Sequence, residues 1–174
     1  MKIRKRHIAA WSGAAICMVS FATAADKLSE LQAHFDHETS AVRKVKALEK
    51  LGDAEFEETR RAGTAGDYNT VGVTLEKYRD NVRAALDTLK KEHPDAERQS
   101  NGYRQLEIHV RKGIREVDEI LLLAPEQYNP PIRLVRRDLV SFDDEMLRML
   151  FPRRPEPPPA KPPDAAQPPS EKQP

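Results

Sequence analysis

YNTVGVTLEKYRDNVRAALDTLKK is the sequence of residues 68–91, and its apolar side chains recur at alternating steps of three and four. They are Tyr68, Val71, Leu75, Tyr78, Val82, Ala85 and Leu89. Side chains at these spacings share one face of an α-helix, as the a and d positions of a heptad do. This stretch therefore predicts a long helix that buries one side against other helices.

The segment before this stretch has a similar pattern over a greater length. Between Asp26 and about Ala62 there is no proline, and apolar residues recur at steps of three, four and seven. They are Leu28, Leu31, Phe35, Val42, Val45, Leu48 and Leu51. These spacings predict one long amphipathic helix. The segment 63–67 then interrupts it, with a glycine suited to end one helix and an aspartate suited to begin the next.

A third helix is predicted after residue 90. Pro94, followed by Asp95 and Glu97, is typical of a first helical turn, where a missing N–H costs nothing and carboxylates favour the helix dipole. The apolar face of this helix is Tyr103, Leu106, Val110, Gly113, Val117, Ile120 and Ala124. Gly113 on this face would let another helix approach closely or accept a large side chain.

Pro125, Pro130 and Pro131 frame a short irregular connection before a final helix. That helix is indicated by Val135, Leu139, Phe142, Met146 and Met149, and ends at Phe151-Pro152. Short connections at 63–67 and 90–94 favour antiparallel neighbours. The expected fold is all-α: an antiparallel, coiled-coil-like bundle of three long helices plus a shorter C-terminal helix, with a disordered proline-rich tail.

The composition agrees with a helical bundle. Charged residues are 33% of the 174, aromatic residues only 6%, and there are only 7 glycines, which suits long surface-rich helices better than a β-sandwich. A chain of this length is expected to form one domain.

The N-terminus has the three-part layout of a secretory signal. A basic start with Lys2, Arg4, Lys5 and Arg6 precedes an apolar run from Ile8 to Phe21, and Ala22-Thr23-Ala24 offers small residues for cleavage. We expect cleavage after Ala24 and export to the periplasm or the extracellular space. The mature chain would then have 25 basic and 28 acidic residues, a balance that gives no electrostatic case for nucleic acid as partner.

Two alternatives to cleavage involve a membrane. An uncleaved anchor would rest on about 15 apolar residues, interrupted by Ser12, Gly13 and Ser20, fewer than the ~20 that span a bilayer. Acylation of Cys17 would require a better preceding triplet than Ala14-Ala15-Ile16. Cys17 is the only cysteine, so a chain cleaved after Ala24 has no disulfide, thiol nucleophile or cysteine-based zinc site.

The predicted organisation is a signal peptide at 1–24, a helical bundle domain at 25–151 and a disordered tail at 152–174. Proline makes up 10 of the 24 residues from Phe151 to Pro174, and such a composition cannot bury a core. The tail is expected to be a solvated segment, or a tether or spacer in the cell envelope.

One candidate metal site stands on the first predicted helix. Glu30, His34 and His37 fall within about 60° of arc on it, and imidazole with carboxylate suits zinc or another divalent ion. The alternative is a polar helix face that happens to hold two histidines. His93 and His109 are single residues, each expected on the surface.

No other motif indicates a cofactor or catalysis. No histidine has a glutamate three residues before it, as di-iron bundles require, and the haem-attachment, P-loop, nucleophile-elbow and dinucleotide motifs do not occur. Adjacent acids such as Glu57-Glu58 and Asp143-Asp144-Glu145 point about 100° apart on a helix and form no acid/base pair. We expect no enzyme activity and no cofactor.

The last helix combines basic and acidic residues. Arg133, Arg136, Arg137 and Arg148, with Arg153 and Arg154 after them, could bind a membrane surface or an acidic polymer. Asp138 and Asp143-Asp144-Glu145 interleave with them and blunt that attraction. We therefore favour a packed helix with a mixed-charge outer face.

Gly66-Asp67-Tyr68 followed by Leu75 resembles the turn and second helix of a tetratricopeptide repeat, a family of helical-hairpin scaffolds. The resemblance covers one hairpin and implies an interaction module. The chain departs from the family at Thr59 and Val71, where small residues are usual, and no repeat near 34 residues follows.

The sequence thus favours an exported helical protein that binds or scaffolds a protein partner or another envelope component. The alternatives are a metal- or small-ligand-binding bundle and a tetratricopeptide-like interaction module. The apolar faces are equally compatible with one chain or with an oligomer.

Overall fold

The computed structural model describes residues 19–152, with side chains from Asp26 onward. This part of the chain is all-helical, without a strand, as predicted. Its elements are α1 (Val19–His37), α2 (Ala41–Thr64), α3 (Tyr68–Glu92), α4 (Ser100–Leu123), the 3₁₀ helix η1 (Glu126–Tyr128) and α5 (Asn129–Leu150). Residues 1–18 of the predicted signal peptide and 153–174 of the predicted tail lie outside the described residues.

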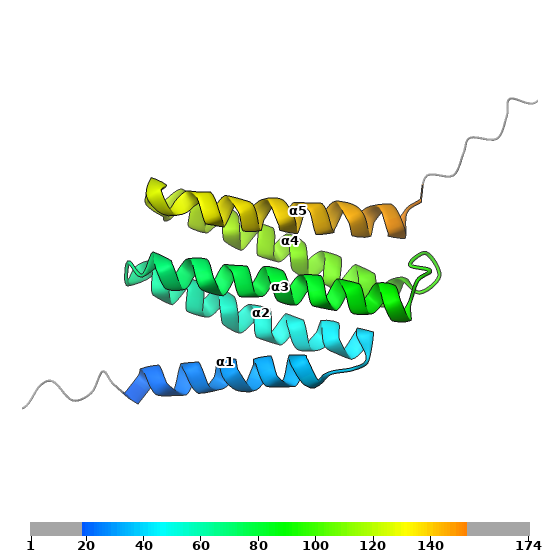
Figure 1. Cartoon of the computed structure of the whole chain (residues 1–174), viewed down its shortest axis with the longest axis horizontal. Helices are drawn as coiled ribbons and strands as arrows, with labels where there is room; N and C mark the ends of the chain where they lie inside the picture. The colour runs from blue at the N-terminus through cyan, green and yellow to red at the C-terminus, as the bar shows by residue number, and fades with distance from the viewer. Residues whose placement is uncertain (1–18, 153–174) are drawn as a thin grey trace, which may run out of the picture.

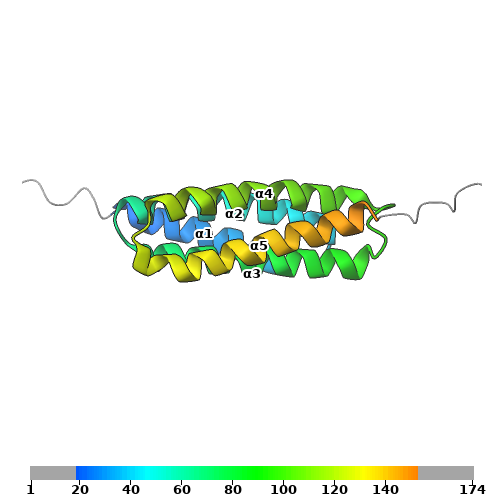
Figure 2. The same ribbon diagram turned by 90° about the horizontal axis from the view of Figure 1, so that it is seen from above.

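Successive helices run in alternating directions along one common axis (Figure 1). Helices α2, α3, α4 and α5 pack around one core, with α2 against α3 and α4, and α5 against the same two helices. Helix α1 packs along α2, on the side away from α4 and α5 (Figures 1 and 2). The described part is therefore a four-helix core with a fifth helix added on one face.

The apolar faces predicted from the sequence form this core. Along α3, every residue of the predicted face is buried except Tyr68, which is half-buried. On α4, Tyr103, Leu106, Val110 and Val117 are buried as well. Each fully buried leucine or valine contributes about 1.5–3 kcal/mol, so the interlocking faces are the main source of stability.

The single long helix expected from Asp26 to Ala62 is wrong. The chain forms two helices there, α1 and α2, and turns back at residues 38–40 (Figure 1). The apolar residues of α1 and α2 pack on the same core, and their spacing happens to continue across the turn. The spacing alone therefore does not predict the break between the two helices.

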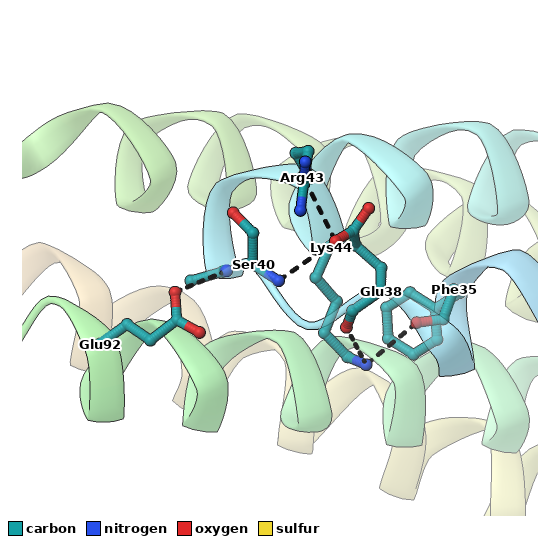
Figure 3. A network of polar contacts seen from close by, with 7 residues as sticks. Phe35, Glu38, Ser40, Arg43, Lys44 and Glu92 are labelled. Atoms are coloured by element: carbon teal, nitrogen blue, oxygen red, sulfur yellow. Dashed lines mark hydrogen bonds and ion pairs between the residues drawn. The ribbon is translucent and has the colours of Figure 1, made fainter.

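Polar contacts hold this turn (Figure 3). Lys44 Nζ donates hydrogen bonds to the carbonyl oxygens of Phe35, at 3.0 Å, and Glu38, at 3.3 Å, at the end of α1. The Glu38 carboxylate accepts a hydrogen bond from the Ser40 amide, and Glu92 Oε2 of α3 accepts one from the Ala41 amide at 2.8 Å. Backbone groups at both helix ends thus find side-chain partners, and the Ala41 amide finds one 51 residues away in the sequence.

A further expectation about a helix end is also wrong. The third long helix begins at Ser100 and not at Pro94, because Asp95 closes a separate turn by accepting hydrogen bonds from the amides of Arg98 and Gln99. Helix α5, expected to be shorter than the three long helices, has 22 residues and is only two residues shorter than α4. Pro130 and Pro131 lie in its first turn, where no N–H is needed.

Candidate functional site

A polar cluster lies inside the apolar core and joins three helices. Glu55 of α2 is 2% exposed, and its Oε1 accepts a hydrogen bond from Asn81 Nδ2 of α3 at 3.2 Å. Asn81 also exchanges two hydrogen bonds of 3.1 Å with the side-chain amide of Gln32 on α1. These contacts give α1 a fixed register on the four-helix core.

Burial changes the ionisation of Glu55. Loss of contact with water raises the pKa of this carboxyl to about 8, although Lys77 and the Asn81 hydrogen bond both act to lower it. Glu55 is therefore largely protonated at neutral pH. No described side chain gives its Oε2 atom a hydrogen bond.

Beside this cluster, an aromatic group fills the space between α2, α3 and α4. The Tyr78 ring packs edge-on against Phe56 and His109, with centroid distances of 4.7 and 5.8 Å, and its hydroxyl donates to the His109 carbonyl oxygen. Burial raises the pKa of Tyr78 and lowers that of His109 to about 4. His109 is therefore neutral, and the expectation that it lies on the surface is wrong, because it is only 6% exposed.

Two glycines make room for these rings. A Cβ atom on Gly113 would lie 2.5 Å from Tyr78 Oη, and one on Gly52 would lie 2.4 Å from His109 Nε2. The expectation that Gly113 accepts a large side chain is confirmed: that side chain is Tyr78.

The chemistry open to this cluster is limited by its burial. A protonated carboxyl, a neutral imidazole and a phenol are groups that catalytic sites use. Here their side chains are almost wholly enclosed by helices, so a substrate would reach them only if the bundle opened. The geometry instead suits a cluster that fixes the register of the helices.

The sequence places these polar residues on the apolar faces of their helices. Glu55 follows Leu48 and Leu51 at helical spacing, Asn81 lies between Tyr78 and Ala85, and His109 lies between Leu106 and Gly113. Polar residues on an apolar face of a helix are buried with it, and they need partners from neighbouring helices.

The predicted metal residues Glu30, His34 and His37 all lie exposed on α1. Within residues 26–152, no group of three or more His, Cys, Asp or Glu side chains is arranged to hold a metal ion. The metal site stays a prediction. If it exists, purified protein will contain stoichiometric metal that is lost in His34→Ala.

The arginines predicted to form a basic end are partly paired. Arg136 forms an ion pair with Asp118 of α4, and Arg137 one with Asp138. Arg133 and Arg148 are exposed. The outer face of α5 in this structure therefore carries both signs of charge.

An accessible apolar surface lies at the end of the bundle where α2 turns into α3. A groove of about 280 Å³ is lined there by Gly63, Tyr68, Ile120 and Leu123, together with the polar residues Thr59, Arg60, Thr64, Glu116 and Glu119. Leu122 and Leu123, at the end of α4, are 85% and 79% exposed. Tyr68 stacks on Tyr128 of η1 at 5.2 Å and donates a hydrogen bond to the Leu123 carbonyl oxygen.

Compared with known protein families, with curated proteins and with solved structures, the chain matches none of them. Among the helices of the described residues, none has the length and apolar character needed to cross a bilayer.

Proposed function

We propose that this protein works outside the cytoplasm as a non-enzymatic binding or scaffolding element of the cell envelope. The predicted export signal brings the chain to the membrane and is removed after Ala24, and the proline-rich tail that follows the bundle serves as its tether. Its partner would be another envelope component.

The observation that carries this proposal is the position of the two ends of the described part of the chain, residues 19 and 152. Helix α1 begins at the end of the bundle that contains the α2–α3 turn and η1, and α5 ends at the opposite end (Figures 1 and 2). A helix of 24 residues is about 36 Å long. The start of α1 and the end of α5, which precedes the predicted tail, therefore lie at opposite ends of a packed body of that length.

The buried cluster around Glu55 supports a mechanical role over a catalytic one. Its polar side chains bind one another across three helices, and such networks rigidify a bundle and fix its register. A scaffolding element needs this rigidity. The tetratricopeptide-like alternative, an interaction module, would use the same helices but needs neighbouring repeats.

The test is co-purification from cross-linked cells of partners of the full chain and of a chain that ends at Pro152. If the tail tethers the bundle, at least one envelope partner should be lost on truncation. A matched control replaces residues 153–174 with a glycine- and serine-rich segment of equal length, which keeps the reach but changes the chemistry. Identical partners for all three chains would contradict the tether role.

A further inference from the structure

Helix α1 is the least firmly packed helix of the described chain. Its backbone adjoins α2 and no other helix of residues 26–152. Of its described side chains only Phe35 is buried, and Leu28, Leu31 and Gln32 are half-buried. Each of the helices α2 to α5 packs against at least two others, so the four-helix core is complete without α1 (Figure 1).

Glu55 lies beneath the middle of α1. Leu28 of α1 lies beside Ala54, the residue that precedes Glu55 on α2. One turn further along α1, Gln32 exchanges hydrogen bonds with Asn81, which donates another to Glu55 Oε1. Lifting α1 would remove one side of this enclosure and would open Glu55 to water.

The hydrogen bonds around Glu55 suit a protonated carboxyl better than a carboxylate. The side chain is enclosed, Asn81 donates one hydrogen bond to Oε1, and Oε2 accepts none from the described residues. A carboxylate offers about four lone-pair sites to donors, and a buried charge without enough partners is costly. Ionisation of Glu55 therefore favours a state of the bundle in which water reaches it.

The titratable and charged groups around Glu55 come from four helices. They are Asp36 of α1, Asp53 of α2, Lys77 and Tyr78 of α3, and His109 and Glu116 of α4. Lys77 is exposed and attracts the ionised carboxyl. Burial raises the pKa of Tyr78 and lowers that of His109 to about 4, so both stay neutral between pH 6 and 8. Over this range the charge that changes in the core is that of Glu55.

We propose that α1 is a pH-sensitive lid on α2, which opens more often as the pH rises because Glu55 then loses its proton. With α1 lifted, Ala47 and Leu51 would be uncovered. Both are buried, and they lie between Lys44 and Ala54 on the face of α2 that α1 covers. An apolar strip of α2 would thus become accessible under mildly basic conditions. The lid does not depend on the envelope role proposed above.

The test follows hydrogen exchange in the full chain by mass spectrometry at pH 6 and pH 8. Each rate is divided by the exchange rate of an unprotected amide at the same pH. We expect this ratio to rise at least about tenfold in α1, because the pKa of Glu55 is about 8 under the lid and near 4.5 once exposed. At both pH values α1 should be less protected than α4, which exchanges only when the four-helix core opens.

Two variants isolate the contribution of Glu55. Glu55→Gln cannot ionise and should remove the acceleration in α1. Glu57→Gln, which removes an exposed carboxylate from the same helix, is the matched control and should keep it. The exposed histidines His34 and His37 of α1 are present in every chain, so any effect of their protonation is common to all three.

A second measurement keeps the natural Glu55. In a chain with Cys17→Ser, a thiol reagent should reach Ala47→Cys only when α1 lifts, since Ala47 is 4% exposed. Its reaction rate, divided by that of Val73→Cys on the exposed face of α3, should rise at least about tenfold from pH 6 to pH 8.

Three exchange results would overturn the inference: rates in α1 that do not depend on pH, equal protection of α1 and α4, or the same acceleration in Glu55→Gln. Rates without pH dependence would mean that Lys77 neutralises Glu55 while α1 stays in place. If Glu55→Gln does not fold, the cysteine measurement decides, because a constant ratio of the two reaction rates also contradicts the lid.

Discussion

Gly113 and Gly72 are both glycines inside helices, but their surroundings differ. The Cβ of an alanine at 113 would overlap the buried Tyr78 ring, whereas one at 72 would meet no atom within 4 Å. We expect Gly113→Ala to lower the free energy of unfolding by about 2 kcal/mol through overpacking, and Gly72→Ala to raise it by about 0.5–1 kcal/mol through helix propensity. Urea denaturation of both variants measures this, and equal effects would contradict the packing described here.

The pH dependence of stability should follow from Glu55 and His109. Burial raises the pKa of Glu55 to about 8, whereas the pKa of a glutamic acid in the unfolded chain is near 4.5. The contribution of Glu55 to the free energy of unfolding therefore falls as the pH rises between these values. Burial lowers the pKa of His109 to about 4, whereas the pKa of a histidine in the unfolded chain is near 6.5. The contribution of His109 to the free energy of unfolding therefore falls as the pH falls from 6.5 to 4.

The contributions of Glu55 and His109 to the free energy of unfolding change in opposite directions between pH 4.5 and 6.5, and above pH 6.5 only that of Glu55 changes. We expect the free energy of unfolding to fall by about 2 kcal/mol from pH 6.5 to 8. Glu55→Gln keeps an acceptor for Asn81 without a charge and should abolish this fall. A variant that loses stability over this interval as steeply as the natural chain would show that another group is responsible.

At the residue scale, then, part of the site could be predicted from the sequence. The role of Gly113 followed from its position on a helix face. The burial of His109, which was expected on the surface, and that of Glu55, for which there was no sequence-based expectation, did not follow from the sequence. Their pKa values depend on burial against other helices, which the spacing of apolar residues does not identify.

Among the elements, α1 depends most on single contacts, because it packs on the four-helix core from one side. Glu92→Ala removes the acceptor of the Ala41 amide at the start of α2. We expect a loss of about 1 kcal/mol in unfolding free energy and faster hydrogen exchange in α1 and in the first turn of α2. Glu76→Ala, exposed on the same helix as Glu92, is the matched control and should change neither.

The break between α1 and α2 shows why helix ends are harder to predict than helix faces. Ser40 begins α2, but its side chain makes no capping hydrogen bond. The carboxylates of Glu38 and Glu92 accept the amide hydrogen bonds in its place, and Glu92 is 51 residues away from Ala41. A contact at that separation has no local signal in the sequence.

For the whole molecule, the all-helical class and most of the core followed from the spacing of apolar residues. The number of helices did not, since one predicted helix proved to be two, and the predicted short last helix is nearly as long as its neighbour. The start of α1 and the end of α5 lie at opposite ends of the bundle because the number of long helices is odd, whereas the four helices predicted would place them at the same end.

The central claim is that the bundle works outside the cytoplasm, and a fusion of alkaline phosphatase after Pro152 tests it most directly, since this enzyme becomes active only after export. We expect whole cells that express the fusion to show phosphatase activity. A fusion with Ile16→Arg and Val19→Asp, which places charges in the apolar run, should lose most of it at equal protein amount. Equal, low activity from both fusions would contradict the claim.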